Sequence, residues 1–198
     1  MTSASALSII REEHAAVSAL LRSMRLLVDQ GPGEQRARYF ETIRAMLFYM
    51  EEFPERRHHP NESTQLFPML VRAAPELQAV IDRLEADHVA GEHRVRELQH
   101  MLVGWEFVGE SRRAGFVAAL HEYVRLYLQH MRAEETYLLP QAAALLKPSQ
   151  LADLNLAFAA ARDPLAAGHH DPIYEELFDR IVQQAPPPIG LGSGPTER

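Results

Sequence analysis

The chain contains the stretch HHPNESTQLFP at residues 58–68 and the stretch HMRAEETYLLP at residues 130–140. Both follow the pattern His-x3-Glu-x3-Leu-x-Pro, and each member of the second copy lies 72 residues after its counterpart. A shorter echo relates Glu13-His14-Ala15-Ala16 to Asp87-His88-Val89-Ala90, an acidic residue followed by histidine, 74 residues apart. We therefore expect a pair of helices in the first half of the chain to be repeated in the second half.

The repeated pattern predicts a metal site. Residues four apart lie on one face of an α-helix, so the histidine and the glutamate of each pattern can reach the same metal pair. Two such helices, each with one histidine from the helix before it, can surround a shared axis and form a cage for two ions. The predicted ligands are His14, His58, Glu62, His88, His130 and Glu134.

The donor types limit the chemistry of this site. The chain has no cysteine, so a metal must use nitrogen and oxygen ligands. Four imidazoles and two bridging carboxylates supply about eight of the roughly twelve bonds that two six-coordinate ions need. The remaining positions are expected to admit a small ligand such as water, dioxygen or nitric oxide.

Apolar residues at three- and four-residue steps predict four long helices, and the prolines and glycines between them predict short connections. A kink or irregular stretch is expected between Phe53 and Pro60, where Pro54 breaks the second helix. This order predicts an all-α fold, an up-and-down four-helix bundle over residues 1–147. The expected helices span about residues 5–30, 34–72, 75–101 and 111–146.

Residues 148–198 are expected to form a helical extension that packs outside the bundle. Ser149 resembles the N-cap of a short helix that reaches about Ala161, and Pro172 resembles the first turn of another that ends near Gln184. Residues 185–198 are rich in proline and glycine and are expected to be irregular.

Other polar residues near the predicted ligands allow further interpretations. His59 lies about 100° around the helix from His58, and His93 about 140° from His88, so an additional ligand is the minor alternative for both. Glu92 shares the face of His88 and could bind metal or accept a hydrogen bond from an imidazole. Glu13, Asp87 and Glu135 are interpreted as outer or surface groups. Packing or a hydrogen bond near His130 is expected for Tyr123, Tyr127 and Tyr137, and solvent exposure for His100, His121, His169 and His170.

The formal net charge of -7 gives no basis for binding nucleic acid, whose phosphates need a basic surface. No apolar run approaches the roughly 18 residues that indicate a membrane span. The simplest interpretation is a soluble cytoplasmic protein with neither a nucleic-acid nor a membrane partner. The oligomeric state is not indicated.

The motifs REEHAAV, FPERRHHPNESTQLFP, LEADHVAGEH and YLQHMRAEETYLLP resemble the hemerythrin-like family, also called the HHE cation-binding domain, over roughly residues 5–145. The resemblance implies a four-helix bundle with a carboxylate-bridged di-iron centre, and it implies the same six ligands. Members of the family are implicated in binding dioxygen, in responses to nitric oxide or oxidative stress, and in sensing iron. Glu92 stands where oxygen-carrying hemerythrins have a second histidine on the third helix, which favours stress response or metal handling over oxygen carriage.

The expected function is therefore that of a non-haem di-iron protein that binds a small diatomic ligand. Zinc or manganese would also accept these donors, so the choice of iron depends on the resemblance. One alternative is a di-iron enzyme that activates or reduces the ligand with electrons from a donor protein. The other is a metal-free helical bundle in which the polar residues form hydrogen-bond networks.

Overall fold

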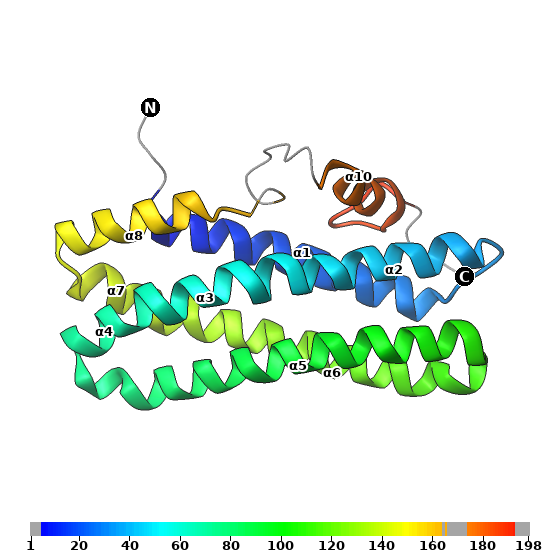
Figure 1. Ribbon diagram of the computed structural model, residues 1–198, viewed down its shortest axis with the longest axis horizontal. Coiled ribbons are helices and arrows are strands. Elements are labelled where there is room, and N and C mark those ends of the chain that lie inside the picture. The colour runs from blue at the N-terminus through cyan, green and yellow to red at the C-terminus, as the bar shows by residue number, and fades with distance from the viewer. Residues whose placement is uncertain (1–4, 164, 166–173, 193–198) are drawn as a thin grey trace.

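The computed structural model describes residues 5–163, 165 and 174–192. Within these residues every regular element is helical, which confirms the all-α prediction. In Figure 1 the long helical segments lie side by side, and shorter helices from the C-terminal part of the chain lie against one side of them. None of the described helices is both long and apolar enough to cross a membrane.

The four long segments agree with the predicted order but differ in detail. The first is α1 (Ala6–Gln30). The third is α5 (Gln78–Val108) after the 3-10 turn η3 (Pro75–Leu77), and it runs seven residues past the expected end at residue 101. The second and fourth segments each combine α-helices with π-helical or 3-10 turns. The second comprises α2 (Arg36–Met50), η1 (Glu51–His58), α3 (His59–Asn61), η2 (Glu62–Leu66) and α4 (Phe67–Ala73); the fourth comprises η4 (Glu110–Arg112), α6 (Arg113–Ala133), η5 (Glu134–Leu138) and α7 (Leu139–Leu145).

Local sequence sets the ends of the helices. Ser5 caps α1, because its side chain accepts a hydrogen bond from the backbone N–H of Ser8 at 3.2 Å. Gly31 ends α1 with φ 79°, and Gly109 ends α5 with φ 108°. Glycine adopts these positive angles without the steric cost that other residues meet, so the chain reverses at these two points.

The irregular stretch expected between Phe53 and Pro60 is present, but the second segment is not broken at Pro54. It continues through π-helical turns, in which each N–H bonds to the carbonyl five residues earlier; the N–H of His59 bonds to Pro54 in this way. Pro54 lacks an N–H and would clash with the carbonyl four residues earlier in a regular α-helix. The wider turn relieves that clash and keeps the helix continuous.

The internal repeat is also present in the backbone. The π-helical segments η2 and η5 begin at Glu62 and Glu134, and each precedes a proline, Pro68 or Pro140. In both copies a threonine hydroxyl donates to the carbonyl four residues earlier, at 2.6 Å from Thr64 and 2.7 Å from Thr136. The repeated sequence thus produces the same irregular turn twice, each time at a glutamate.

The apolar core consists of two clusters with a polar layer between them. One cluster contains Met24, Phe40, Trp105 and Phe116, and the other contains Ile10, Phe67, Leu84 and Leu138. On α1 the interval between the clusters holds Glu13 and His14, so the polar layer crosses the bundle at that level.

The extension packs against the bundle, as Figure 1 shows for α8 beside α1 and for α10 near α2. Helix α8 (Pro148–Ala160) begins one residue before the expected N-cap Ser149, and Lys147 is at its N-cap position. Helix α10 (Glu175–Gln184) ends where it was expected to end. The predicted first turn at Pro172 and the histidines at 169 and 170 lie outside the described residues.

Candidate metal centre

The structure brings the six predicted ligands together in the polar layer. All six side chains are buried, and Glu62 and Glu134 are fully inaccessible to solvent. Each of the four long segments supplies at least one of them. They are His14 from α1, His58 and Glu62 from the second segment, His88 from α5, and His130 and Glu134 from the fourth segment.

The four imidazoles form two pairs. The Nε2 atoms of His14 and His58 lie 3.2 Å apart, and those of His88 and His130 lie 3.1 Å apart. Each pair therefore presents two nitrogen donors to one point, which is the arrangement that a metal ion with two imidazole ligands requires.

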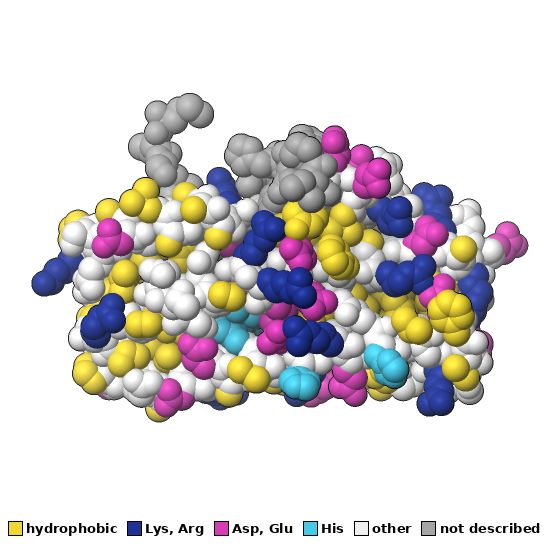
Figure 2. All heavy atoms as spheres, viewed as in Figure 1, with side chains coloured by type: hydrophobic (Ala, Val, Ile, Leu, Met, Phe, Trp, Pro, Cys, Tyr) yellow, Lys and Arg dark blue, Asp and Glu magenta, His cyan; other side chains and the backbone are white. Residues whose placement is uncertain are grey.

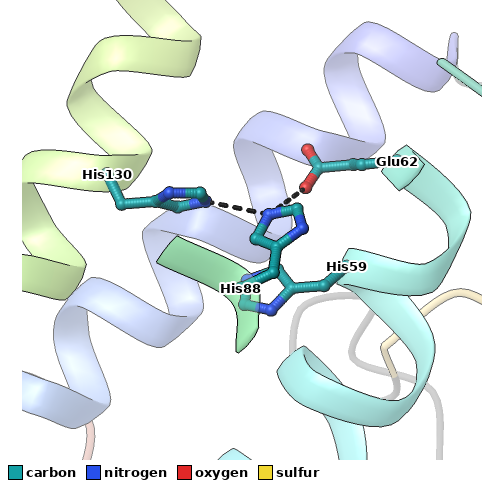
Figure 3. Close-up of side chains that lie close together, drawn as sticks. All are labelled: His59, Glu62, His88 and His130. Carbon is teal, nitrogen blue, oxygen red and sulfur yellow. Dashed lines mark hydrogen bonds and ion pairs between the residues drawn. The ribbon is translucent and has the colours of Figure 1, made fainter. Parts of the chain in front are cut away.

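The two glutamates connect these pairs. Glu62 Oε1 lies 3.3 Å from Nε2 of His58, and its Oε2 lies 3.6 Å from Nε2 of His88. Figure 3 shows this second contact beside the contact between His88 and His130. Glu134 makes the matching connection, because its Oε2 lies 3.4 Å from His14 and its Oε1 lies 3.2 Å from His130. Each carboxylate thus has one oxygen toward each imidazole pair.

The carboxylate oxygens at this site face only imidazole nitrogens. Within the described part of the chain, no hydrogen bond of normal geometry reaches either oxygen of Glu62 or Glu134, and their polar neighbours are the imidazole nitrogens at 3.2–3.6 Å. A buried carboxylate without partners is costly, and buried acids are normally hydrogen-bonded, paired or bound to metal. Four such oxygens facing four imidazole nitrogens fit two cations with nitrogen and oxygen ligands.

The opposite nitrogen of each imidazole, Nδ1, faces an oxygen atom. Carboxylates held against the outer nitrogen of a ligating histidine fix its tautomer and orientation. This placement agrees with the interpretation of Glu13, Asp87 and Glu135 as outer groups. The contacts are Glu13 to His58 at 2.6 Å, Glu135 to His14 at 3.1 Å, Ser63 to His88 at 3.2 Å and Asp87 to His130 at 3.5 Å.

His59 joins the cluster, although rotation on an ideal α-helix directs it away. Its ring stacks on that of His88 with centroids 3.9 Å apart, and one of its ring nitrogens lies within 4.8 Å of a nitrogen or oxygen atom of each of Glu62, His88 and His130. The wider π-helical turn rotates less per residue, so adjacent His58 and His59 both reach the interior. The two prolines around this stretch were the signal for that irregularity.

Both ring nitrogens of His59 have protein partners. Its Nδ1 lies 3.0 Å from a carboxylate oxygen of Glu55, and its Nε2 lies 3.0 Å from the hydroxyl of Tyr127. If the tyrosine hydroxyl donates to Nε2, the proton of the imidazole sits on Nδ1 and is donated to Glu55. The three side chains form a buried hydrogen-bonded chain beside the six predicted ligands.

Other candidates do not reach the cluster. Glu92 forms a surface ion pair with Arg96 at 2.6 Å, and His93 is exposed. The expectation that Tyr137 lies near His130 is wrong, because Tyr137 falls within the π-helical segment η5 and its side chain is 47% exposed. Tyr123 is buried as expected, whereas His121 forms a partly exposed ion pair with Asp29 at 2.8 Å.

The buried carboxylates at this site favour positively charged neighbours. Burial opposes protonation of His58, but Glu62 and Glu13 outweigh it and hold the pKa of His58 well above its usual value. Burial likewise opposes protonation of His130, yet Glu134 and Asp87 raise its pKa to about 10. Burial lowers the pKa of His88 to about 3, so these three imidazoles differ strongly. The carboxylates thus attract cationic charge into the layer, as a metal site must.

Two comparisons with known proteins agree with this geometry. The model of the hemerythrin HHE cation-binding domain matches residues 5–142. An uncharacterised protein of Haemophilus influenzae is 26% identical over 124 residues, which cover 62% of this chain and 70% of that protein. Because the match spans more than half of the chain, including all six predicted ligands, the protein belongs to the hemerythrin HHE cation-binding domain family.

Proposed function

We propose that this protein is a non-haem di-iron protein with His14, His58, Glu62, His88, His130 and Glu134 as its metal ligands. The observation that carries the proposal is the pair of buried glutamates, each with one oxygen toward each imidazole pair. One ion would bind between His14 and His58 and the other between His88 and His130. Glu62 and Glu134 would bridge them.

The proposal assigns this centre to residues 1–147, as an up-and-down four-helix bundle, and treats residues 148–198 as an extension. Membership of the HHE cation-binding family supports iron as the native metal. The nitrogen and oxygen donors would also accept zinc or manganese, so metal identity is part of the test.

The space beside the ligands supports a very small exogenous ligand. Two cavities of about 20 and 10 Å³ are both lined by His59 and Tyr127, one also by His130 and the other by His14 and His58. Cavities of this size hold roughly one water molecule. They favour a diatomic molecule over an organic substrate, and two ferrous ions would supply affinity for dioxygen or nitric oxide.

Stress response, sensing or metal handling fits this site better than oxygen carriage. Glu92, which occupies the position of the second histidine of oxygen carriers, is engaged with Arg96 at the surface. One turn along α5 from His88, Gly91 leaves room for Glu55, whose oxygen would lie 3.0 Å from a Cβ at position 91. The chain of Glu55, His59 and Tyr127 fills this region with hydrogen-bonding groups.

That same chain favours a second candidate, an enzyme that reduces or activates the bound ligand. Tyr127 and His59 could move a proton toward the site, and Glu55 could exchange it, because burial raises the pKa of Glu55 to about 8. Electrons would come from a donor protein. Turnover of dioxygen or nitric oxide with a chemical reductant distinguishes this enzyme from a binding protein.

Metal titration of variants tests the ligand assignment. We expect wild type to bind two Fe²⁺ or Co²⁺ ions per chain, and Glu62→Ala or Glu134→Ala to weaken binding of at least one by more than about a hundredfold, since loss of outer partners alone costs about 10–100-fold. Glu92→Ala, on the surface of α5, is the matched control and should bind as wild type does. Two tightly bound ions in both Glu62→Ala and Glu134→Ala would contradict the ligand assignment, whereas a wild type that binds none would favour the metal-free bundle.

A further inference from the structure

The four ligand histidines differ in how firmly their outer nitrogens are held. Glu13, the partner of His58, is buried, with its side chain 5% exposed. The acidic partners of His14 and His130 are 40–45% exposed; they are Glu135 and Asp87. The outer nitrogen of His88 faces the hydroxyl of Ser63, which donates to Glu85, and the side chain of Glu85 is also 40% exposed. Exposed carboxylates exchange their contacts with water and hold an imidazole less firmly.

Glu13 is fixed by a contact from the extension. The backbone N–H of Asp163 donates to Glu13 Oε1 at 2.8 Å, while Glu13 Oε2 faces His58 Nδ1. Both oxygens of the carboxylate therefore have a partner. The donor comes from a residue 150 positions along the chain, just after α8.

Asp163 is itself held on both sides. The buried hydroxyl of Tyr49 donates to Asp163 Oδ2, and the backbone N–H of Leu165 donates to its Oδ1 at 2.9 Å. Tyr49 is fully buried and Asp163 is 5% exposed, so water does not compete for these bonds. The side chain of Asp163 thus sets where its own backbone N–H points.

The internal repeat provides a comparison within the molecule. Asp87 is the counterpart of Glu13, and it lies 3.5 Å from Nδ1 of His130. Its side chain is 45% exposed, and none of the described hydrogen bonds fixes it from the extension. Two halves that are alike in sequence therefore differ because the extension covers one of them.

We infer that Asp163 is a positioning residue for the metal centre: through its backbone N–H it orients Glu13, and Glu13 orients His58. This inference depends on the proposed di-metal function and assigns a role to residues 148–198 within it. It makes the ion between His14 and His58 the more firmly held of the two, and it makes that hold depend on docking of the extension.

Release of metal to a chelator tests the inference. Wild type loaded with two Co²⁺ ions is mixed with excess EDTA, and the loss of each ion is followed by the visible spectrum. Asp163→Ala should release one of the two ions about tenfold faster than wild type, within the range measured for outer-shell changes. Asp163→Asn should restore slow release, because an amide can still accept from Leu165 and contact Tyr49.

Two further variants separate positioning from general loosening. Arg162→Ala removes the neighbouring ion pair with Glu12 and should release both ions at wild-type rates. In a Glu13→Ala background, Asp163→Ala should cause no additional acceleration, because the residue through which it acts is gone. Far-UV circular dichroism checks that each variant is folded.

The outcomes are distinct. If wild type binds two ions and Asp163→Ala releases both at the wild-type rate, the positioning role is wrong and the di-metal function stands. Equal acceleration by Arg162→Ala and Asp163→Ala would also overturn it. A wild type that binds no pair of ions overturns the proposed function and this inference together.

Discussion

Glycine at position 91 has a role that can be separated from helix formation. On α5, a Cβ at position 91 would lie 3.0 Å from a carboxylate oxygen of buried Glu55, whereas a Cβ at Gly104 would meet nothing within 4 Å. Glu55 cannot move freely, because it is held against His59. Gly91 therefore makes room for the buried hydrogen-bonded chain.

We predict opposite effects of alanine at these two glycines. Gly104→Ala should stabilise the protein by about 0.5–1 kcal/mol, because alanine is the better helix former. Gly91→Ala should lose that gain and destabilise by about 1–2 kcal/mol through crowding of Glu55. Urea unfolding of the two variants measures the difference, and equal stabilisation by both would show that Glu55 is free to move.

Asp163 predicts a pH dependence of stability. Burial raises its pKa to about 6 from 3.8, against the opposing effect of its bond from Tyr49. Between these values the folded chain holds the proton more tightly than the unfolded chain, so the contribution of Asp163 to stability falls as pH rises. The stability of Asp163→Asn relative to wild type should therefore rise by about 2 kcal/mol between about pH 4 and 6. Above that range the difference in stability should stay constant.

Urea unfolding in steps of pH checks this expectation. The same substitution at exposed Asp153 on α8 is the control for a general change of charge. A constant difference between Asp163→Asn and wild type from pH 4 to 7 would mean that the Asp163 carboxyl is not perturbed by burial.

The sequence predicts which residues form the site better than it predicts the direction in which each side chain points. The spacing of His58 and Glu62, repeated at His130 and Glu134, was enough to predict a cluster that the structure brings together. The places of His59 and Tyr137 were mispredicted because both residues lie in or beside π-helical turns, where α-helical rotation does not apply. The sequence does not indicate the contact between Asp163 and Glu13, because these residues lie 150 positions apart.

At the scale of elements, the apolar periodicity predicts which segments are helical. It does not predict whether a helical segment is continuous or broken. Pro54 suggested a break, but tertiary packing on both sides keeps the second segment helical through η1. The sequence could place the irregularity and could not tell a wide turn from a broken helix. The difference matters because η1 ends at the predicted ligand His58, and the other π-helical segments, η2 and η5, begin at Glu62 and Glu134.

Helix α8 offers a direct test of how the extension is held. Phe158 is 1% exposed and belongs to the apolar cluster of Ile10 and Phe67, whereas Leu156 on the same helix is 73% exposed. Phe158→Ala should destabilise the protein by about 3–5 kcal/mol, as for large buried aromatics. Leu156→Ala, the matched control, should stay within about 0.5 kcal/mol in thermal or urea unfolding.

A small effect of Phe158→Ala would show that α8 contributes little to the core. The extension would then be held mainly by its other contacts, such as buried Leu154 and Ile181 and the bond from the Ala6 N–H to Asn155 at 2.6 Å.

At the scale of the whole molecule, a polar layer lies between two apolar clusters. Figure 2 shows histidine side chains at the surface of one face among acidic and basic residues, while the six predicted ligands are buried within the bundle. Such a layer costs stability unless its charges are balanced, because buried carboxylates and imidazoles lose their hydration. Two bound cations would balance the two glutamates and join all four long segments at one level.

The measurement that tests this account most directly is metal content together with a visible spectrum. Protein purified without added metal is analysed for its elements, and its spectrum is recorded without oxygen and again after exposure to air. We predict two irons per chain and absorption bands that depend on oxygen. A chain that binds fewer than two metal ions even after loading with iron would contradict the di-iron centre, and a chain that binds none would leave a structural helical bundle.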